Sequence, residues 1–184
     1  MVVDGKKLNL VSDNIWTEYR SRKICCQEKT NINAVKIGAI LDAESGLVHA
    51  FYNGEMTPIS EIPTSGYASY DSPKTALIFI LRDNGQGPVD TYGNVKLLAD
   101  FGEKTVKGSL YNGLVTVDAN ISESTFNGNG VLNINEEGKK EWQIGEGELA
   151  APLNGAFFGE KAEEIAGEAH NGKWGVVFAA EQQK

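Results

Sequence analysis

The chain has 184 residues, enough for one domain or two small ones, and a formal net charge of −8 at pH 7. That charge argues against nucleic acid and against an anionic membrane surface as partners, because neither would attract the chain at long range. No apolar run is long enough to span a bilayer. The 21 glycines separate short segments of alternating apolar and polar residues, a pattern typical of many short β-strands joined by turns.

Residues 1–63 are expected to form a small β-rich domain. Residues 6–11 predict a first strand, and residues 15–27 predict further strand, although the spacing of Trp16 and Tyr19 also suits a helical turn. Residues 34–53 predict a hairpin whose five-residue loop ends in glycine. Residues 57–66 contain two prolines and show no periodicity, so we place the domain boundary between residues 63 and 64.

The two cysteines, Cys25 and Cys26, are adjacent. In an extended strand their side chains would point to opposite faces, so a disulfide between them would need an unusual turn. The spacing matches no zinc motif. We therefore expect two reduced, partly buried thiols, with a disulfide between the neighbours as the second alternative and a metal or catalytic role as the third.

Residues 64–184 predict a succession of strands with short connections. Pro73 interrupts the first of them, residues 136–140 are expected to form a charged turn, and residues 160–164 a single helical turn. The expected strands are residues 66–70, 75–82, 92–101, 105–111, 114–121, 124–134, 141–149, 155–159, 165–169 and 174–180. About eight such strands can close into an up-and-down barrel. The predicted fold is therefore all-β: an eight-stranded antiparallel up-and-down β-barrel preceded by a small β-rich N-terminal domain.

Four segments in this order resemble a known family. They are residues 66–70 (GYASY), 98–108 (LADFGEKTVKG), 155–167 (GAFFGEKAEEIAG) and 177–180 (VFAA). They resemble the β-barrel of transferrin-binding protein B, factor H-binding protein and the hemophilins, which are surface or secreted proteins of Gram-negative bacteria. Residues 72–74 depart from the family pattern because they contain a proline. In this fold we expect one of Phe157 and Phe158 to fill the barrel and the other to face outward or toward the small domain.

The resemblance implies a surface-exposed lipoprotein on the extracellular face of the outer membrane, held by a lipid anchor that residues 1–5 do not supply, with a secreted protein as the alternative. It implies a handle-like role for residues 1–63 and, as partner, a host serum protein such as a complement factor, in immune evasion. A monomer is expected. Aromatic and charged residues usually anchor such contacts. The candidate contact residues are Trp16, Tyr19, Arg20 and Tyr52. For Trp142 and Trp174 the alternative to partner contact is that their side chains fill the barrel.

The sequence lacks the motifs of common enzymes, and we expect no catalytic activity. His49 and His170 are the two histidines, and neither a Gly-x-Ser-x-Gly elbow nor a phosphate-binding loop is present. Glu160, Glu163 and Glu164 occupy one turn, which predicts a solvated acidic surface rather than an acid/base pair.

His49 suggests an alternative function. It shares a strand face with Phe51, and a histidine beside aromatic residues can be an axial haem ligand. The hemophilins, whose barrel is similar, bind haem. The interpretation that we favour is a half-exposed strand histidine and a protein without cofactor. A haem carrier that uses His49 is the alternative.

Overall fold

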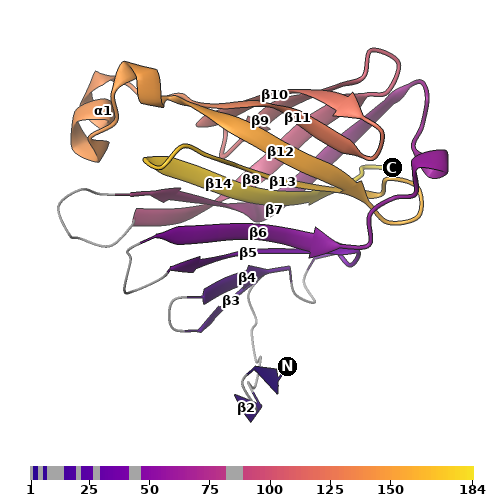
Figure 1. Ribbon diagram of the computed structural model, residues 1–184, viewed down its shortest axis with the longest axis horizontal. Coiled ribbons are helices and arrows are strands. Elements are labelled where there is room, and N and C mark those ends of the chain that lie inside the picture. The colour runs from indigo at the N-terminus through magenta and orange to yellow at the C-terminus, as the bar shows by residue number, and fades with distance from the viewer. Residues whose placement is uncertain are drawn as a thin grey trace.

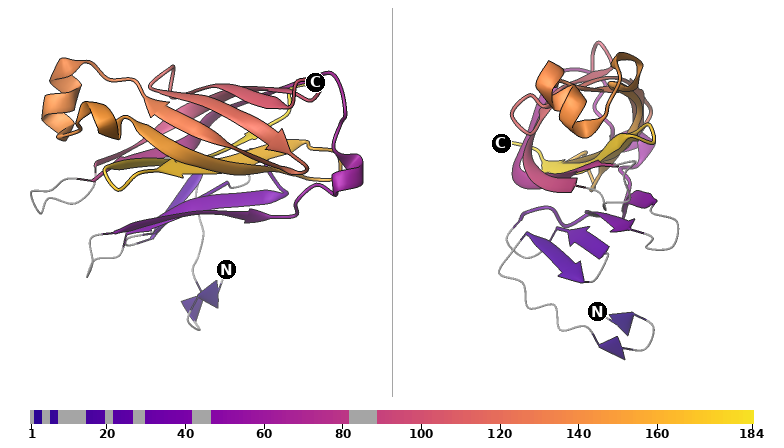
Figure 2. Two further views of the ribbon diagram at one scale, coloured as in Figure 1. Left: turned by 45° about the horizontal axis from the view of Figure 1, so that its top comes forward. Right: turned by 90° about the vertical axis from the view of Figure 1, so that its left-hand side faces the viewer.

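The computed structural model describes residues 2–3, 6–7, 15–19, 22–26, 30–41, 47–81 and 89–184. Within these residues a small antiparallel sheet lies along one side of a closed β-barrel (Figures 1 and 2). Figure 2 shows the barrel end-on with the small sheet below it. The all-β prediction, with an eight-stranded antiparallel barrel and a separate N-terminal sheet, is confirmed.

The N-terminal sheet, which we call the handle sheet, is a four-stranded meander. Its strands are β3 (Trp16–Tyr19), β4 (Arg22–Cys25), β5 (Val35–Leu41) and β6 (Val48–Gly54). The segment around Trp16 is thus a strand and not a helical turn, because its backbone pairs with β4 from Trp16↔Cys25 onward. The predicted hairpin is confirmed as β5 and β6. Ahead of the sheet, β1 (Val2–Val3) pairs with β2 (Lys6–Lys7), and the rest of the strand expected over residues 6–11 lies outside the described residues.

A linker joins the handle sheet to the barrel and contacts one end of the barrel. It contains a single 3-10 turn, η1 (Ile59–Glu61), and the position proposed for the domain boundary falls within it. Met56 forms an isolated bridge with Phe158, and the Thr57 amide donates to the Phe157 carbonyl at 3.0 Å. The first residues of the linker are therefore bonded to the barrel backbone.

Eight strands pair antiparallel in sequence order, and the last pairs with the first to close the barrel. They are β7 (Tyr67–Ile80), β8 (Val89–Asp100), β9 (Thr105–Leu110), β10 (Val115–Ser122), β11 (Thr125–Leu132), β12 (Ala150–Phe158), β13 (Glu164–His170) and β14 (Trp174–Glu181). Closure leaves no unpaired strand edge in the barrel.

The expected break at Pro73 is wrong. β7 runs through it without interruption, because the pairing with β8 shifts register between Ser72 and Ala76 and Lys74 takes a positive φ of 59°. Proline has no N–H to donate, and a bulge is a place where a strand tolerates that loss.

The expected charged turn at residues 136–140 and strand at 141–149 are also wrong. The chain forms α1 (Glu136–Trp142) and a 3-10 turn, η2 (Glu146–Glu148), before β12 begins. The Asn135 side chain accepts from the Gly138 amide and caps the helix, acidic residues occupy its first turn, and lysines occupy its last. Among the described residues, no helix has the length and apolar character needed to cross a membrane.

Side chains fill the barrel. Phe157 is fully buried at the centre of an aromatic group, with ring centroids 5.4 Å from Phe101, 5.7 Å from Phe126 and 6.1 Å from Tyr70. Burial raises the pKa of the Tyr70 phenol, which donates to the Ala162 carbonyl at 2.7 Å. Trp174 lies in the same core, as the barrel-filling alternative predicted, and Trp142 packs against it partly buried.

Candidate functional site

The handle sheet buries one face against the outer wall of the barrel. The shared cluster takes side chains from β3 to β5 and from β7, β12, β13 and β14, among them Trp16, Val35, Ile37, Ala39, Leu77, Phe158, Ala166 and Val177. Phe157 and Phe158 thus point to opposite sides of the barrel wall, as the alternation predicted. The two sheets share an apolar interface, which holds the outer faces of both in a fixed relation.

The expectation of reduced thiols at Cys25 and Cys26 is wrong. The two residues form a disulfide with an S–S distance of 2.06 Å, and both are fully buried in the interface. Opposed cysteine side chains require an extended strand through both residues, but β4 ends at Cys25. The structure therefore agrees with the second alternative, a disulfide between the two neighbours.

The candidate contact residues Trp16 and Tyr52 lie on the barrel side of the handle sheet. Trp16 is 5% exposed, stacks on Tyr92 with ring centroids 4.9 Å apart, and donates its indole N–H to the Lys74 carbonyl at 2.6 Å. Tyr52 is half-buried and meets Phe158 edge-on at 6.2 Å. The barrel therefore covers both rings in part or in full.

The other two candidates are placed less completely. The backbone of Tyr19 ends β3, where it pairs with Arg22. Arg20 lies outside the described residues. Partner contact by Trp16, Tyr19, Arg20 and Tyr52 stays a prediction.

A polar cluster borders the interface beside Trp16. The Lys23 ammonium lies 2.6 Å from an Asp90 carboxylate oxygen and 3.5 Å from Glu18, and the Tyr92 hydroxyl donates to Glu18. That hydrogen bond lowers the pKa of Glu18, while burial, followed by the hydrogen bond to Glu18, raises the pKa of Tyr92. The cluster ties β3 and β4 to β8 through charge-assisted bonds.

Replacing Tyr92 by phenylalanine is expected to raise the pKa of Glu18. A carboxylate with a lowered pKa in the folded state stabilises above its unfolded pKa, and that stability is lost as pH falls through the folded pKa. Tyr92→Phe should therefore lose less stability than wild type between pH 7 and pH 3. The difference should be no more than about 1 kcal/mol because Glu18 is largely exposed. Urea unfolding at a series of pH values measures it, and parallel curves for the two proteins would contradict the assignment.

Glu164 contradicts the expectation that the acidic turn is solvated throughout. Its side chain is 5% exposed and accepts backbone N–H bonds from Asn33 at 2.6 Å, Ala34 at 3.0 Å and Val35 at 3.1 Å. It begins β13 on the side that the handle covers, so its carboxylate caps the start of β5. No local pattern in the sequence marks this contact, because its partners are about 130 residues away along the chain.

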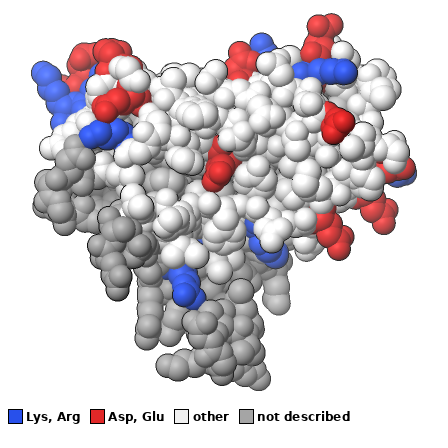
Figure 3. Space-filling view, viewed as in Figure 1, with Lys and Arg blue, Asp and Glu red and all other residues white. Residues whose placement is uncertain are grey.

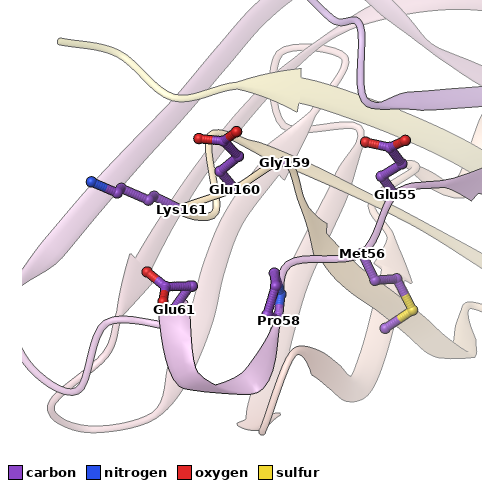
Figure 4. Close-up of a pocket in the computed structure, with 7 residues that line it drawn as sticks. All are labelled: Glu55, Met56, Pro58, Glu61, Gly159, Glu160 and Lys161. Atoms are coloured by element: carbon purple, nitrogen blue, oxygen red, sulfur yellow. The ribbon is translucent and has the colours of Figure 1, made fainter.

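A pocket of about 380 Å³ opens where the linker passes the turn between β12 and β13 (Figure 4). Met56 and Pro58 contribute apolar surface, while the carboxylates of Glu55, Glu61 and Glu160 stand around it. All three carboxylates are exposed. Lys161 adds one opposing charge, so the pocket is net acidic and suits neutral or cationic groups. Within the described part of the chain, no three His, Cys, Asp or Glu side chains are placed to hold a metal ion.

His49 does not lie in a setting that fits haem. It is exposed on the face of β6 turned away from the barrel, opposite Ile40, which is itself 37% exposed. The other aromatic on that face, Phe51, lies over Gly38, where a Cβ would come within 2.6 Å of its ring. The pocket beside the linker does not include His49. A porphyrin bound to His49 would lie on the exposed face of the sheet and not in a pocket. The residues around His49 therefore do not fit haem.

A small sheet packed on the outer wall of a filled eight-stranded barrel defines a handle-and-barrel architecture. Residues 62–182 match the family of C-lobe and N-lobe β-barrels of transferrin-binding protein B. The chain belongs to this family, as the sequence motifs suggested. No curated protein sequence matches the chain.

Solved structures share the fold across the handle sheet and the barrel. Isotype 1 transferrin-binding protein B from serogroup B Neisseria meningitidis has 22% identity and a TM-score of 0.69, over 100% of this chain and 37% of that protein. A protein described as a surface lipoprotein has 20% identity and a TM-score of 0.66, over 99% and 89%. HpuA from Kingella denitrificans, solved in complex with human haemoglobin, has 14% identity and a TM-score of 0.62, over 89% and 62%. The chain spans about two fifths of the length of the transferrin-binding proteins B from Haemophilus parasuis and Neisseria meningitidis that it matches.

Proposed function

We propose that this chain is the binding module of a bacterial surface lipoprotein that captures a host serum protein. The observation that carries the proposal is the family match over residues 62–182. It is supported by the likeness of the whole handle-and-barrel unit to binding proteins named for transferrin or solved with haemoglobin. Among serum proteins, we propose an iron-carrying protein first. A complement factor, the partner first suggested by the sequence, is the competing choice.

The structure supports binding at an outer surface rather than inside the barrel. The interior is filled by buried side chains, with Phe157, Trp174, Phe126 and Phe178 all fully buried. An eight-stranded barrel of this kind has room for its own side chains and little else. The interface with the handle is likewise apolar and closed, so the surfaces left to a partner are the outward faces of the strands and the loops at the barrel ends.

Attachment and oligomeric state complete the proposal. We propose that a lipid anchor holds the protein on the extracellular face of the outer membrane. We further propose that it acts as a monomer. An acidic surface agrees with this placement, since it does not draw the module onto anionic lipid.

Surface plasmon resonance against three purified human proteins tests the proposed function. The immobilised chain should bind transferrin or haemoglobin in physiological salt, with factor H as the complement arm. An unrelated acidic protein of similar size and charge, immobilised at equal density, is the control. Binding of factor H alone would move the proposal to the complement partner, and binding of none of the three above the control would overturn it.

A further inference from the structure

The outward face of β10 to β13 carries a row of side-chain amides that ends in a carboxylate. Cross-strand pairing places Asn120 opposite Asn127, Asn127 opposite Asn154, and Asn154 opposite Glu168. Asn129 lies on the same face of β11, two residues beyond Asn127. Neighbouring strands are about 4.8 Å apart, so the row is continuous. We call these five residues the amide face.

The asparagines of the amide face are exposed and unengaged. None of the four side chains hydrogen-bonds to another group within the described part of the chain. Each amide offers two N–H donors and one oxygen acceptor. The face therefore presents hydrogen-bonding groups of both kinds, held at strand spacing by the barrel.

Charge is scarce on this side of a strongly acidic chain. Figure 3, in which β11 and β12 lie toward the viewer as in Figure 1, shows charged side chains gathered toward the two ends of the barrel and few between them. The nearby Asp118 is already matched by Lys107 at 3.5 Å. Glu168 is different, because no Lys or Arg of the described residues lies within ion-pair distance of it.

Glu168 is also partly removed from water. It is half-buried where the handle meets the barrel, and this burial raises the pKa of its carboxyl group. The neighbouring Tyr52 of the handle has a raised pKa as well, mainly through its own burial and then through the charge of Glu168. The charge of the nearby His170 offsets this only in part. A carboxylate that is partly desolvated and has no Lys or Arg partner gains more from a new ion pair than an exposed one does.

We propose that the amide face is the surface through which this chain holds its protein partner, with an arginine or lysine of the partner paired to Glu168 and polar groups of the partner hydrogen-bonded to the asparagines. The proposal rests on the proposed function and assigns its contact surface. Arginine fits best, because its planar guanidinium can pair with a carboxylate through two parallel hydrogen bonds.

The size and charge of the face favour a protein partner over other occupants. Four strands at the usual spacing give a footprint on the order of 400 Å², about half of the ~800 Å² per partner of a standard interface. The adjoining edge of the handle at Tyr52 continues that surface. A neutral glycan would use the amides but leave Glu168 without a cation. A second copy that packed the same face against this one would bring Lys107 near it, and Asp118 already engages that lysine.

Charge reversal at Glu168 tests the proposal on whichever of human transferrin, haemoglobin or factor H the wild-type chain binds. Glu168→Lys should weaken binding at least about 30-fold, the lower end for loss of a buried charge pair. Glu168→Gln should weaken it about 10-fold, less than that because Glu168 is only half-buried and the amide can still accept a hydrogen bond. Asn127→Ala should weaken it a few-fold. The matched control is Glu137→Lys, which makes the same charge change on the exposed surface of α1 and should leave binding within about twofold.

The outcomes separate this proposal from the proposed function. Glu168→Gln keeps the shape of the side chain, so it decides the question even if Glu168→Lys unfolds, as thermal unfolding would reveal. If wild type binds a partner and both Glu168 variants bind it equally well, the amide face is not the contact surface, while the proposed function still stands. Absence of any binding by wild type would overturn both. Sedimentation of the wild-type chain as a dimer that Glu168→Gln dissociates would replace the host partner with a second copy.

Discussion

Replacing Phe157 by alanine is expected to lower the free energy of unfolding by about 4 kcal/mol, the usual cost of truncating a fully buried aromatic. The ring is inaccessible to solvent and lies within 6.1 Å, centroid to centroid, of Phe101, Phe126 and Tyr70. The surrounding strands belong to a closed hydrogen-bonded barrel, so they cannot move inward to fill the space. Urea unfolding followed by tryptophan fluorescence measures the loss, because Trp174 reports on the same core.

The control for this prediction is Phe157→Leu. It keeps most of the apolar volume and should cost only about 1 to 2 kcal/mol. A second comparison is Phe158→Ala, which removes the neighbouring ring on the handle side of the wall. It should loosen the handle more than the barrel. Equal stability of Phe157→Ala and wild type would show that the barrel is not packed around this ring.

Replacing Glu164 by alanine is expected to detach the handle sheet from the barrel and lower the free energy of unfolding by about 3 kcal/mol. The carboxylate accepts the backbone N–H groups of Asn33, Ala34 and Val35, and alanine would leave these donors without a partner in a partly or fully buried setting. Each unsatisfied buried group typically costs about 1 to 3 kcal/mol. Hydrogen exchange should show faster exchange in β5 and β6 while β10 and β11 keep their protection.

Glu160→Ala is the matched control for Glu164→Ala. Glu160 lies four residues earlier at the rim of the linker pocket, is exposed, and should change stability by less than about 0.5 kcal/mol. Unchanged exchange in β5 of the Glu164 variant would contradict the role assigned to the carboxylate. If the two variants lost equal stability, the effect would come from removing a negative charge and not from the hydrogen bonds.

The two stability predictions bear on binding as well. Glu168, the proposed partner contact, lies at the seam that Glu164 and Phe158 help to close. If the handle detaches, Glu168 becomes more solvated and the surface continuous with Tyr52 is lost. Glu164→Ala should therefore weaken partner binding even though Glu164 is covered by the handle and touches no partner.

Alternation along the chain was enough to place most of the barrel strands. Interior and exterior side chains alternate in every barrel strand, and β10 repeats this from Val115 to Ser122 without exception. The same alternation predicted that Phe157 and Phe158 lie on opposite sides of the barrel wall. Such information is local, since it depends only on neighbours two residues apart, and a sequence records it directly.

The tertiary structure decided what depends on contacts between distant segments. β7 continues through Pro73 because the extra residues between Ser72 and Ala76 bulge from β7 while pairing with β8 resumes on both sides, and the first barrel strand is long for that reason. Trp16 faces the barrel because the apolar side of its strand meets Tyr92, far along the chain. Glu164 is buried because the handle folds over it, whereas Glu160 and Glu163 of the same turn are exposed. Each of these outcomes depends on which surfaces pack together, and periodicity within one strand carries no record of the partner that will cover it.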